Sequence, residues 1–165
     1  MGTSYRPPQI QDLARLAEIY NHAVRNTATT FDMEEKAPEH FKIFVPGDHL
    51  HRMLVAEIGG EVVAYAGTCP YSQRKAYSRL AEMMVYVHPA WQRMGFGSAL
   101  LAETHKDDFL AGLYTVLVLI DKDHDYLHRV FEGLGYVGKS ELTEVALEFD
   151  RRHSLVIYQK QVTAL

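Results

Sequence analysis

A glycine-rich turn between an expected strand and an expected helix constrains this chain more than any other feature of its sequence. The turn, Gln92-Arg93-Met94-Gly95-Phe96-Gly97-Ser98, follows the apolar run Val85-Tyr86-Val87 and the pair His88-Pro89. Glycines let the backbone turn tightly and approach a ligand closely. The amides of a first helical turn have no backbone partner, and with the helix dipole they form a site for phosphate or pyrophosphate. Arg93 adds a positive charge, so we predict an anion-binding helix start.

Two familiar phosphate-binding motifs do not account for this turn. The dinucleotide fingerprint needs a third glycine three residues after Gly97, where this chain has Leu100. The nucleotide P-loop needs a lysine and then serine or threonine after its last glycine, and none follows here. Because a Gly-x-Gly pair alone is a weak motif, a plain helix start without a ligand stays open at this point.

Hydrophobic periodicity predicts an α+β fold around a mixed sheet. We expect helices over residues 10–25, 38–44, 95–109 and 123–133. We expect strands over residues 53–58, 62–68, 80–87, 114–120, 136–147 and 155–162, with one more at the N-terminal end. This order places helices against a mixed sheet in a single domain of residues 1–165.

Composition limits the partners of the chain. The 17 basic and 21 acidic residues give a net charge of −4, which argues against a general nucleic-acid-binding field. Cys69 is the only cysteine, so an intramolecular disulfide and a multi-cysteine metal site are excluded. No apolar run approaches the roughly 20 residues that span a bilayer, and the first residues lack an apolar signal region. We therefore expect a cytoplasmic protein without membrane contact.

The residues around the glycine turn make the motif more specific than the glycines alone. Gln92-Arg93-Met94-Gly95-Phe96-Gly97 resembles the pyrophosphate loop of the GNAT acetyltransferases, Gln/Arg-x-x-Gly-x-Gly/Ala, and it follows a strand ending in Val-His-Pro as in that family. From about residue 6 to residue 159 the chain is similar to one branch, the phosphinothricin-acetyltransferase-like enzymes. The blocks that carry this similarity are Ala17-Glu18-Ile19-Tyr20-Asn21-His22-Ala23-Val24, Thr29-Thr30-Phe31, Pro70-Tyr71 with Arg74, Ala76 and Tyr77, Ala81-Glu82, and Glu132-x-Leu134-Gly135-Tyr136.

The resemblance implies a fold, a co-substrate and a reaction. The implied fold is a single GNAT domain with a mixed, mostly antiparallel sheet whose two central strands part. The implied reaction is acetyl transfer from acetyl-CoA to the primary amine of a small amino acid or amino-acid analogue. The residues implied to bind acetyl-CoA are Val85, Tyr86 and Val87 along the pantetheine, Gln92, Arg93, Met94, Gly95, Phe96, Gly97 and Ser98 at the pyrophosphate, and His124 where the family has asparagine. Branch members are commonly homodimers, so a homodimer is expected.

Glu82 is the residue that the resemblance assigns as the general base. A base is needed because free amines are mostly protonated at neutral pH and only the neutral amine attacks a thioester. The apolar neighbours of Glu82 in sequence would desolvate it and raise its pKa toward a useful range. The alternative is a strand glutamate that faces solvent or pairs with an arginine. For the acceptor, the resemblance implies Arg74 and Tyr77 beside the pocket and Phe31 as an apolar wall.

Several positions depart from the branch pattern. His124 replaces the asparagine expected to bond the pantetheine. Phe131 stands where related enzymes have a histidine or tyrosine as proposed acid for the thiolate, so Tyr126, His128 or water would have to serve. The stretch Glu148-Phe149-Asp150-Arg151-Arg152-His153-Ser154 replaces a Lys-Phe-Gly-x-Trp-Leu-Asp pattern that helps shape the acceptor pocket, and Ser72 replaces a loop arginine. Phosphinothricin itself is therefore not expected to be the natural acceptor.

Other functions remain open from sequence alone. The acceptor could instead be a protein N-terminus, a lysine, a polyamine or an aminoglycoside, and an acidic trough would point to the last two. The departures at His124 and Phe131 also fit a module that senses acyl-CoA without turnover. A covalent acetyl-cysteine route through Cys69 is conceivable. No metal is expected, because the pair His124 and His128 has no evident third ligand.

Overall fold

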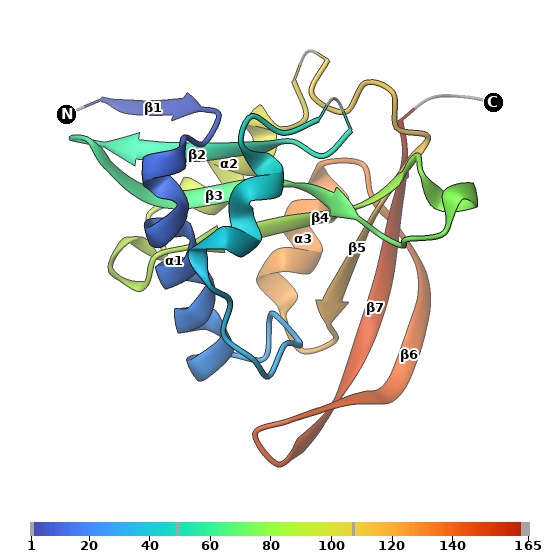
Figure 1. The fold of residues 1–165 in the computed structure, drawn as a ribbon. Coiled ribbons are helices and arrows are strands. Elements are labelled where there is room, and N and C mark those ends of the chain that lie inside the picture. The colour runs from blue at the N-terminus through green and yellow to red at the C-terminus, as the bar shows by residue number, and fades with distance from the viewer. Residues whose placement is uncertain (1, 49, 107, 163–165) are drawn as a thin grey trace.

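Seven strands form one sheet in the order β1-β2-β3-β4-β5-β7-β6, and only β4 and β5 pair in parallel (Figure 1). The computed structural model describes residues 2–48, 50–106 and 108–162. The strands are β1 (Thr3–Arg6), β2 (Met53–Ile58), β3 (Glu61–Pro70), β4 (Leu80–Val87), β5 (Thr115–Asp121), β6 (Val137–Glu148) and β7 (Arg151–Gln161). The helices are α1 (Leu13–Asn26), α2 (Phe96–Glu103) and α3 (Asp125–Gly133), with short 3₁₀ turns η1 (Ile10–Asp12), η2 (Pro38–Phe44), η3 (Lys75–Tyr77) and η4 (Pro89–Trp91).

Each face of the sheet has its own apolar core. On the face that we call the front, α1 and η2 pack on β2 and β3 through a cluster that includes Leu16, Ile19, Phe41 and Tyr65. On the opposite face, α2 and α3 pack through a cluster with Leu100, Leu101, Phe131 and Tyr136. Figure 1 shows α1 before the sheet and α2 and α3 behind it.

Alternation along β4 divides its side chains between the two faces. Ala81, Met83, Val85 and Val87 belong to the rear cluster, whereas Met84 and Tyr86 contact the front one. Because successive side chains of a strand point to opposite faces, Glu82 shares the front face with Met84 and Tyr86.

The two central strands part after a short pairing. The parallel ladder joins Leu80, Ala81 and Glu82 to Thr115, Val116 and Leu117, and stops there. Beyond this point β4 continues along β3, while β5 continues along β7 to Asp121. The expected splay of the sheet is therefore confirmed, and it leaves one edge of β4 from Met83 onward without a neighbouring strand.

Most of the elements expected from sequence are confirmed, with β4 correct at both ends. Two expectations were wrong. The helix expected over residues 95–109 ends at Glu103, because Thr104 Oγ1 donates to the Leu101 carbonyl at 2.8 Å and His105 Nδ1 lies 2.6 Å from the same oxygen. Side chains that bond to backbone carbonyls in this way compete with continuation of a helix. The last strand begins at Arg151 rather than at residue 155.

Candidate active site

A cavity of about 680 Å³ lies where β4 leaves β5. It collects nearly all the residues predicted to bind acetyl-CoA: Val85, Tyr86, Val87, Gln92, Arg93, Gly95, Phe96, Gly97, Ser98 and His124. Met94 is the exception, because it is 61% exposed and does not line the cavity. The cavity is also lined by Trp91 and by Tyr126, one of the acids considered from sequence. Sequence reasoning missed the lining residues Ile19, His22, Ala23, Thr27, Thr29, Leu101, Leu127 and Val130. Several come from the end of α1, which contacts the site only in the folded chain.

The glycine turn has the geometry of an anion site at the start of α2. Gly95 has φ +85°, a left-handed conformation that glycine adopts without penalty. A Cβ at Gly97 would lie 3.3 Å from Val87 Cγ2, so the glycine lets the helix start approach β4 closely. The first backbone bond of the helix runs from Ala99 N to Gly95 O at 3.0 Å, which leaves the preceding amides available. These amides and Arg93 suit a pyrophosphate in this cavity.

The start of α3 forms the opposite side of the cavity. His124 occupies the N-cap position, and the Leu127 amide donates to its Nδ1 at 3.5 Å. Tyr126 is 51% exposed and lines the cavity. His128 has both ring nitrogens engaged, with Nδ1 2.9 Å from the Tyr158 hydroxyl and Nε2 3.0 Å from the Asp121 carbonyl. Phe131 is buried and packs against Tyr136 in the rear core.

Glu82 lies on the last rung at which β4 and β5 are paired. Its Cα partners are Leu117 on β5 and Cys69 on β3. The side chain is half-buried, and this burial raises the pKa of its carboxyl above the ordinary value for glutamic acid. Among the described residues no ion pair reaches it, so neither solvent nor an arginine compensates its charge fully. A carboxyl with a raised pKa is a stronger base than an ordinary glutamate, which suits it to accept a proton.

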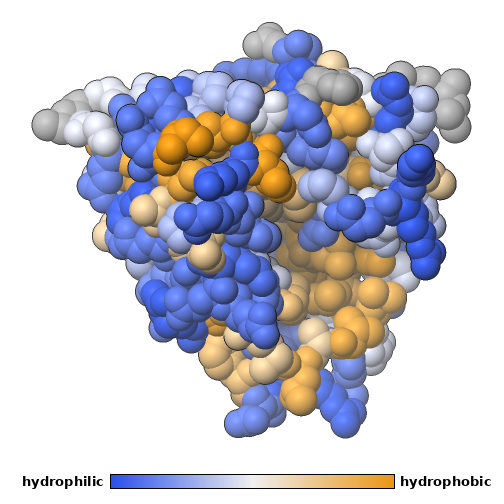
Figure 2. All heavy atoms as spheres, in the orientation of Figure 1, coloured by the Kyte–Doolittle hydropathy of each residue, from blue (hydrophilic) through white to orange (hydrophobic). Residues whose placement is uncertain are grey.

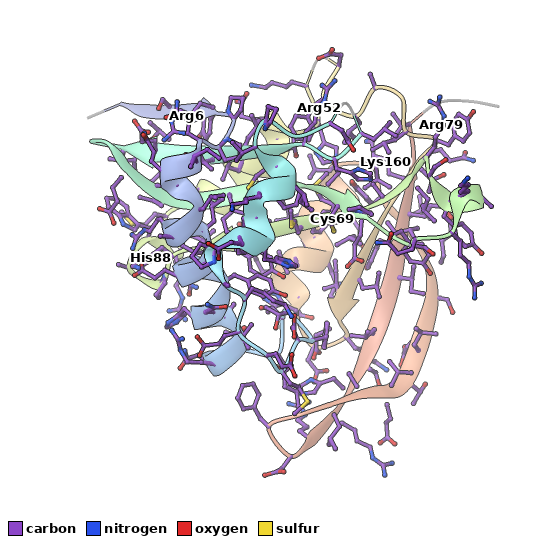
Figure 3. All side chains as sticks on the ribbon, viewed as in Figure 1. Arg6, Arg52, Cys69, Arg79, His88 and Lys160 are labelled. Carbon is purple, nitrogen blue, oxygen red and sulfur yellow. The ribbon has the colours of Figure 1, made fainter. Side chains whose placement is uncertain are left out.

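Cys69 is adjacent to Glu82 but is poorly suited to act as a nucleophile. It lies near the middle of the sheet (Figure 3), and its thiol is 3.6 Å from the Glu82 carbonyl, to which it donates. Burial, with a smaller contribution from the Glu82 charge, raises the pKa of the Cys69 thiol to about 12. Because the thiolate is the reactive form, this environment opposes an acetyl-cysteine route.

The residues predicted for the acceptor lie apart from the cofactor cavity. Arg74 and Tyr77 are exposed in the loop that contains η3, and the Arg74 amide donates to the Ser72 hydroxyl at 3.2 Å. Phe31 is half-buried on the front, with φ +51° and its ring edge-on to His153 at 6.3 Å. Thus Arg74 and Tyr77 flank one end of the front face, and Phe31 flanks the other.

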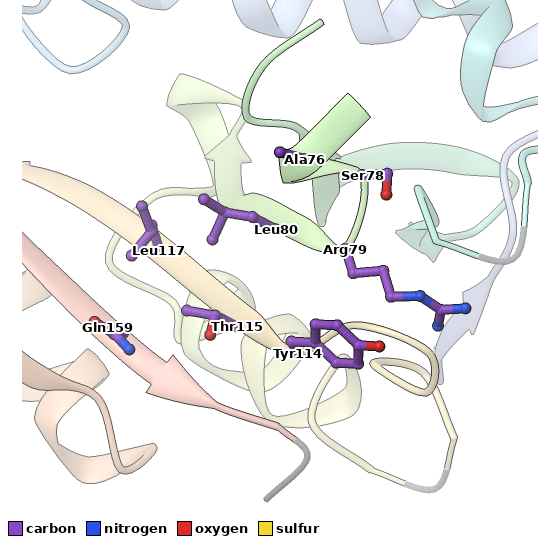
Figure 4. A pocket seen from close by; sticks show the side chains of 8 residues that line it. All are labelled: Ala76, Ser78, Arg79, Leu80, Tyr114, Thr115, Leu117 and Gln159. Atoms are coloured by element: carbon purple, nitrogen blue, oxygen red, sulfur yellow. The ribbon is translucent and has the colours of Figure 1, made fainter. Parts of the chain in front are cut away.

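A second cavity, of about 510 Å³, lies beside the η3 loop (Figure 4). It is lined by Ala76, Ser78, Arg79, Leu80, Tyr114, Thr115, Leu117 and Gln159. Arg79 is held there by donation to the Gly112 carbonyl at 2.7 Å and by its position over the Tyr114 ring. Because Leu117 is the register partner of Glu82, this cavity adjoins the front side of the proposed base.

The segment after α1 is held against the front face by residues from the first signature block. Asn21 Nδ2 donates to the Lys36 carbonyl at 2.9 Å, and the Lys36 amide donates back to Asn21 Oδ1 at 2.8 Å. Tyr20 donates its hydroxyl to Asp32 at 3.2 Å, and its ring packs edge-on against Tyr86 at 5.2 Å. The sequence marked Tyr20 and Asn21 as part of a resemblance, but it gave no role to them or to Asp32.

Within residues 2–48, 50–106 and 108–162, no group of three or more histidine, cysteine, aspartate or glutamate side chains gathers as a metal site would require. Over the same residues, every helix is too short or too polar to span a bilayer.

Known proteins are similar to this chain in sequence and in fold. The profile of the Acetyltransferase (GNAT) family matches residues 13–136. A phosphinothricin N-acetyltransferase of Streptomyces viridochromogenes is 31% identical over 163 residues, covering 94% of this chain and 85% of that protein. The L-amino acid N-acyltransferase MnaT of Escherichia coli is 28% identical over 153 residues, covering 92% of this chain and 89% of that protein.

A solved structure agrees with these sequence matches. The Salmonella typhimurium protein yncA, solved with its cofactor acetyl-CoA, superposes with a TM-score of 0.87 at 25% identity, over 99% of this chain and 95% of that one. The resemblance inferred from the glycine turn and the signature blocks is confirmed. The chain belongs to the GNAT acetyltransferase family.

Proposed function

We propose that this protein transfers the acetyl group of acetyl-CoA to the primary amine of a small amino acid or amino-acid analogue, directly and with Glu82 as the general base. The named relatives act on phosphinothricin or on L-amino acids, which supports this class of acceptor. The observation that carries the proposal is the position of Glu82 on the last paired rung of β4 and β5, three residues before Val85, at which the lining of the cavity begins on β4.

The parted strands explain how the co-substrate is held. The free edge of β4 at Val85, Tyr86 and Val87 offers backbone groups to the amides of a pantetheine arm, as an added strand would. The amides at the start of α2, with Arg93, hold the pyrophosphate, and His124 faces the same cavity. This arrangement aims the thioester at the split beside Glu82.

The chemical step then needs two proton transfers. The acceptor ammonium loses a proton to Glu82, and the free amine attacks the thioester carbon. The carbon–sulfur bond breaks as the amide forms, and the departing thiolate takes up a proton. Overall, one ammonium and one thioester give one amide, one thiol and one proton, which is released to solvent. The raised pKa of Glu82 supports its role in the first transfer.

Tyr126 is our choice for the acid that protonates the thiolate. It lines the cavity on the side of α3, whereas Phe131 is buried in the core and has no proton to give. His128, the third residue considered from sequence, is occupied by the Tyr158 hydroxyl and a backbone carbonyl. In this proposal Tyr126 therefore supplies the proton that Phe131 cannot donate.

The acceptor enters from the front of the sheet in this proposal. Arg74 is an exposed guanidinium close to the end of β4 that carries Glu82, and it suits the carboxylate of an amino acid. Tyr77 packs against Tyr71 in the same loop at 5.8 Å, and Phe31 closes the far end of the face.

The test is thiol release from acetyl-CoA across a panel of amino acids, methionine sulfone and sulfoximine, phosphinothricin, polyamines and aminoglycosides. Wild type, Glu82→Gln and the exposed control Glu61→Gln are compared. We expect turnover with an amino-acid acceptor that is lost in Glu82→Gln and kept in Glu61→Gln. Tight acetyl-CoA binding without turnover of any acceptor would contradict the proposal and favour a sensing module.

A homodimer and a cytoplasmic location also remain proposals. Support for the homodimer comes from β6, a sheet edge with exposed apolar side chains at Val137, Val145 and Leu147. An apolar edge strand of this kind is normally covered by a partner. Light scattering after size exclusion would show a mass near twice that of the chain, and a monomer would contradict the proposal.

A further inference from the structure

Gln159 lies on the same rung of the sheet as Glu82. Its Cα is the register partner of Leu117, which is in turn the partner of Glu82. The preceding residues on the two strands, Val116 and Tyr158, belong to the rear core, so alternation turns Leu117 and Gln159 to the front. The Cα atoms of Glu82 and Gln159 are two strand spacings apart, roughly 10 Å, with Leu117 between them.

The amide of the Gln159 side chain is free to bind a ligand. The side chain is half-buried and lines the second cavity, of about 510 Å³. Within the part of the chain that the structure describes, no hydrogen bond engages this amide group. A glutamine amide has two N–H donors and a carbonyl acceptor. It therefore offers hydrogen bonds to a molecule that enters the cavity beside Glu82.

The second cavity suits an anion better than a cation. Of the eight described residues that line it, none is acidic and one, Arg79, is basic. Gln159 and the Thr115 hydroxyl supply donors from the floor, which the sheet itself forms. The Arg79 guanidinium, held to the Gly112 carbonyl at 2.7 Å, adds positive charge at the other end (Figure 4). An ammonium group would find no countercharge among these lining residues.

The η3 loop forms the wall opposite the floor. Ala76 and Ser78 of this loop line the cavity, and Arg74 is the N-cap residue of η3, two residues before Ala76. Figure 2 shows that the front of the molecule is hollowed, so a small molecule can reach the sheet from this side. A carboxylate that enters there has the loop guanidinium of Arg74 on one side and the Gln159 amide on the other.

The spacing across the rung fits the two charged ends of an α-amino acid. When a hydrogen bond is made at each end, the ammonium and carboxylate of one such molecule span roughly 9 Å from base to amide. This span is close to the separation of Glu82 and Gln159 across Leu117. The ammonium then meets the carboxyl of Glu82, and the carboxylate meets the donors of the cavity.

We propose that the inner end of the second cavity is the subsite for the α-carboxylate of the acceptor, and that Gln159 binds this carboxylate from the floor, across Leu117 from Glu82. The inference rests on the proposed function and adds a specificity-determining residue to it. It makes the carboxylate beside the reacting amine a requirement for fast transfer, so amines that lack one are poor acceptors.

The test compares the best amino-acid acceptor with its carboxamide, in which the carboxylate is replaced by a neutral amide. The kcat/KM is expressed per concentration of free amine, and the ratio of the two acceptors within one protein cancels any effect of a substitution on the base. For wild type we expect a preference of roughly tenfold to a hundredfold for the acid, the range for hydrogen bonds to a charged group.

Two matched variants locate the preference. Gln159→Glu keeps the size of the side chain and adds a negative charge, so it should reverse the preference by raising the KM of the acid. Gln161→Glu is the control, because this exposed glutamine lies on the same face of β7 and does not line the cavity. It should keep the wild-type preference. Gln159→Met, which removes the donors without adding charge, should abolish the preference and serves if Gln159→Glu melts at a lower temperature.

The outcomes separate this inference from the proposed function. Equal values for acid and carboxamide in wild type overturn the inference and leave the acetyltransferase assignment standing. A preference that survives both Gln159 variants, in protein with unchanged melting temperature, also overturns it. Calorimetry of the acid with CoA-loaded protein gives a readout without turnover. Binding that Gln159→Glu weakens, without acetylation in wild type, supports the inference against the function, and neither binding nor acetylation contradicts both.

Discussion

At the scale of single residues, the environment of each side chain decides its role more than its type does. Glu82 is half-buried and Glu148 is buried, and burial raises the pKa of both carboxyls, but Glu82 lies where the strands part and Glu148 lacks a partner at the end of a hairpin. Cys69 is adjacent to Glu82, but burial raises the pKa of its thiol and so disfavours the reactive thiolate. The chemistry of the site follows from solvation and position together.

Cys69→Ala is expected to leave kcat within about twofold of wild type. Burial keeps the Cys69 thiol protonated, so direct transfer does not use it. The measurement is steady-state thiol release, with mass spectrometry of protein quenched during turnover. An acetylated enzyme intermediate that disappears in the variant would contradict direct transfer.

Tyr126→Phe is expected to lower kcat roughly tenfold or more, because the cavity loses its proposed proton donor. The KM for acetyl-CoA should change little. Tyr114→Phe, another exposed tyrosine that does not line this cavity, is the control. The loss should shrink with an acetyl thioester of a more acidic thiol, and a loss that is independent of the leaving thiol would rule out the acid role.

At the scale of elements, the sequence predicts most of the secondary structure but less of the acceptor side. Both ends of β4 are predicted because its apolar run is bounded by clear breaks, and the glycine turn lines the cavity that we propose for acetyl-CoA. The helix after that turn is shorter than its periodicity predicts. The periodicity does not show that Thr104 and His105 hydrogen-bond to the Leu101 carbonyl. The contact of the segment after α1 with the β6–β7 hairpin depends on tertiary packing, so periodicity could not place Glu148 beside Asp32.

Gly95→Ala tests the start of α2. The site around this glycine is open, but its φ of +85° strains any residue with a Cβ by about 1 kcal/mol. We expect a slightly lower melting temperature and a several-fold higher KM for acetyl-CoA, with kcat little changed. Gly133→Ala is the matched control, because it has open space and no positive φ. An unchanged KM in Gly95→Ala would contradict the proposed pyrophosphate site.

At the scale of the whole molecule, the fold tolerates a half-buried carboxyl that destabilises it when ionised. The folded state raises the pKa of Glu82, so it holds that proton more tightly than the unfolded chain does. Protonation of Glu82 therefore contributes to folding stability at low pH. This contribution is lost as the pH rises through the raised pKa of the carboxyl. The parted sheet, which exposes one edge of β4, is a second structural cost of the same site.

Glu82→Gln should therefore be more stable than wild type where the carboxyl is ionised. We expect its melting temperature to exceed that of wild type at about pH 8, with the difference shrinking toward pH 4 as the carboxyl of wild type becomes protonated. Thermal denaturation across this range is the measurement. A variant that is less stable than wild type at every pH would show that the carboxylate is stabilised by a partner.

The most direct test of the central claim is the pH dependence of kcat/KM for wild type and Glu82→Gln with the best amino-acid acceptor. With Glu82 as the base, wild-type activity rises as pH increases through the raised pKa of that carboxyl. The variant should lose this limb, be slower by roughly 10²-fold near neutral pH, and recover partly at high pH as the free amine becomes abundant. A variant that keeps the wild-type profile and rate would contradict the assignment of Glu82 and with it the proposed mechanism.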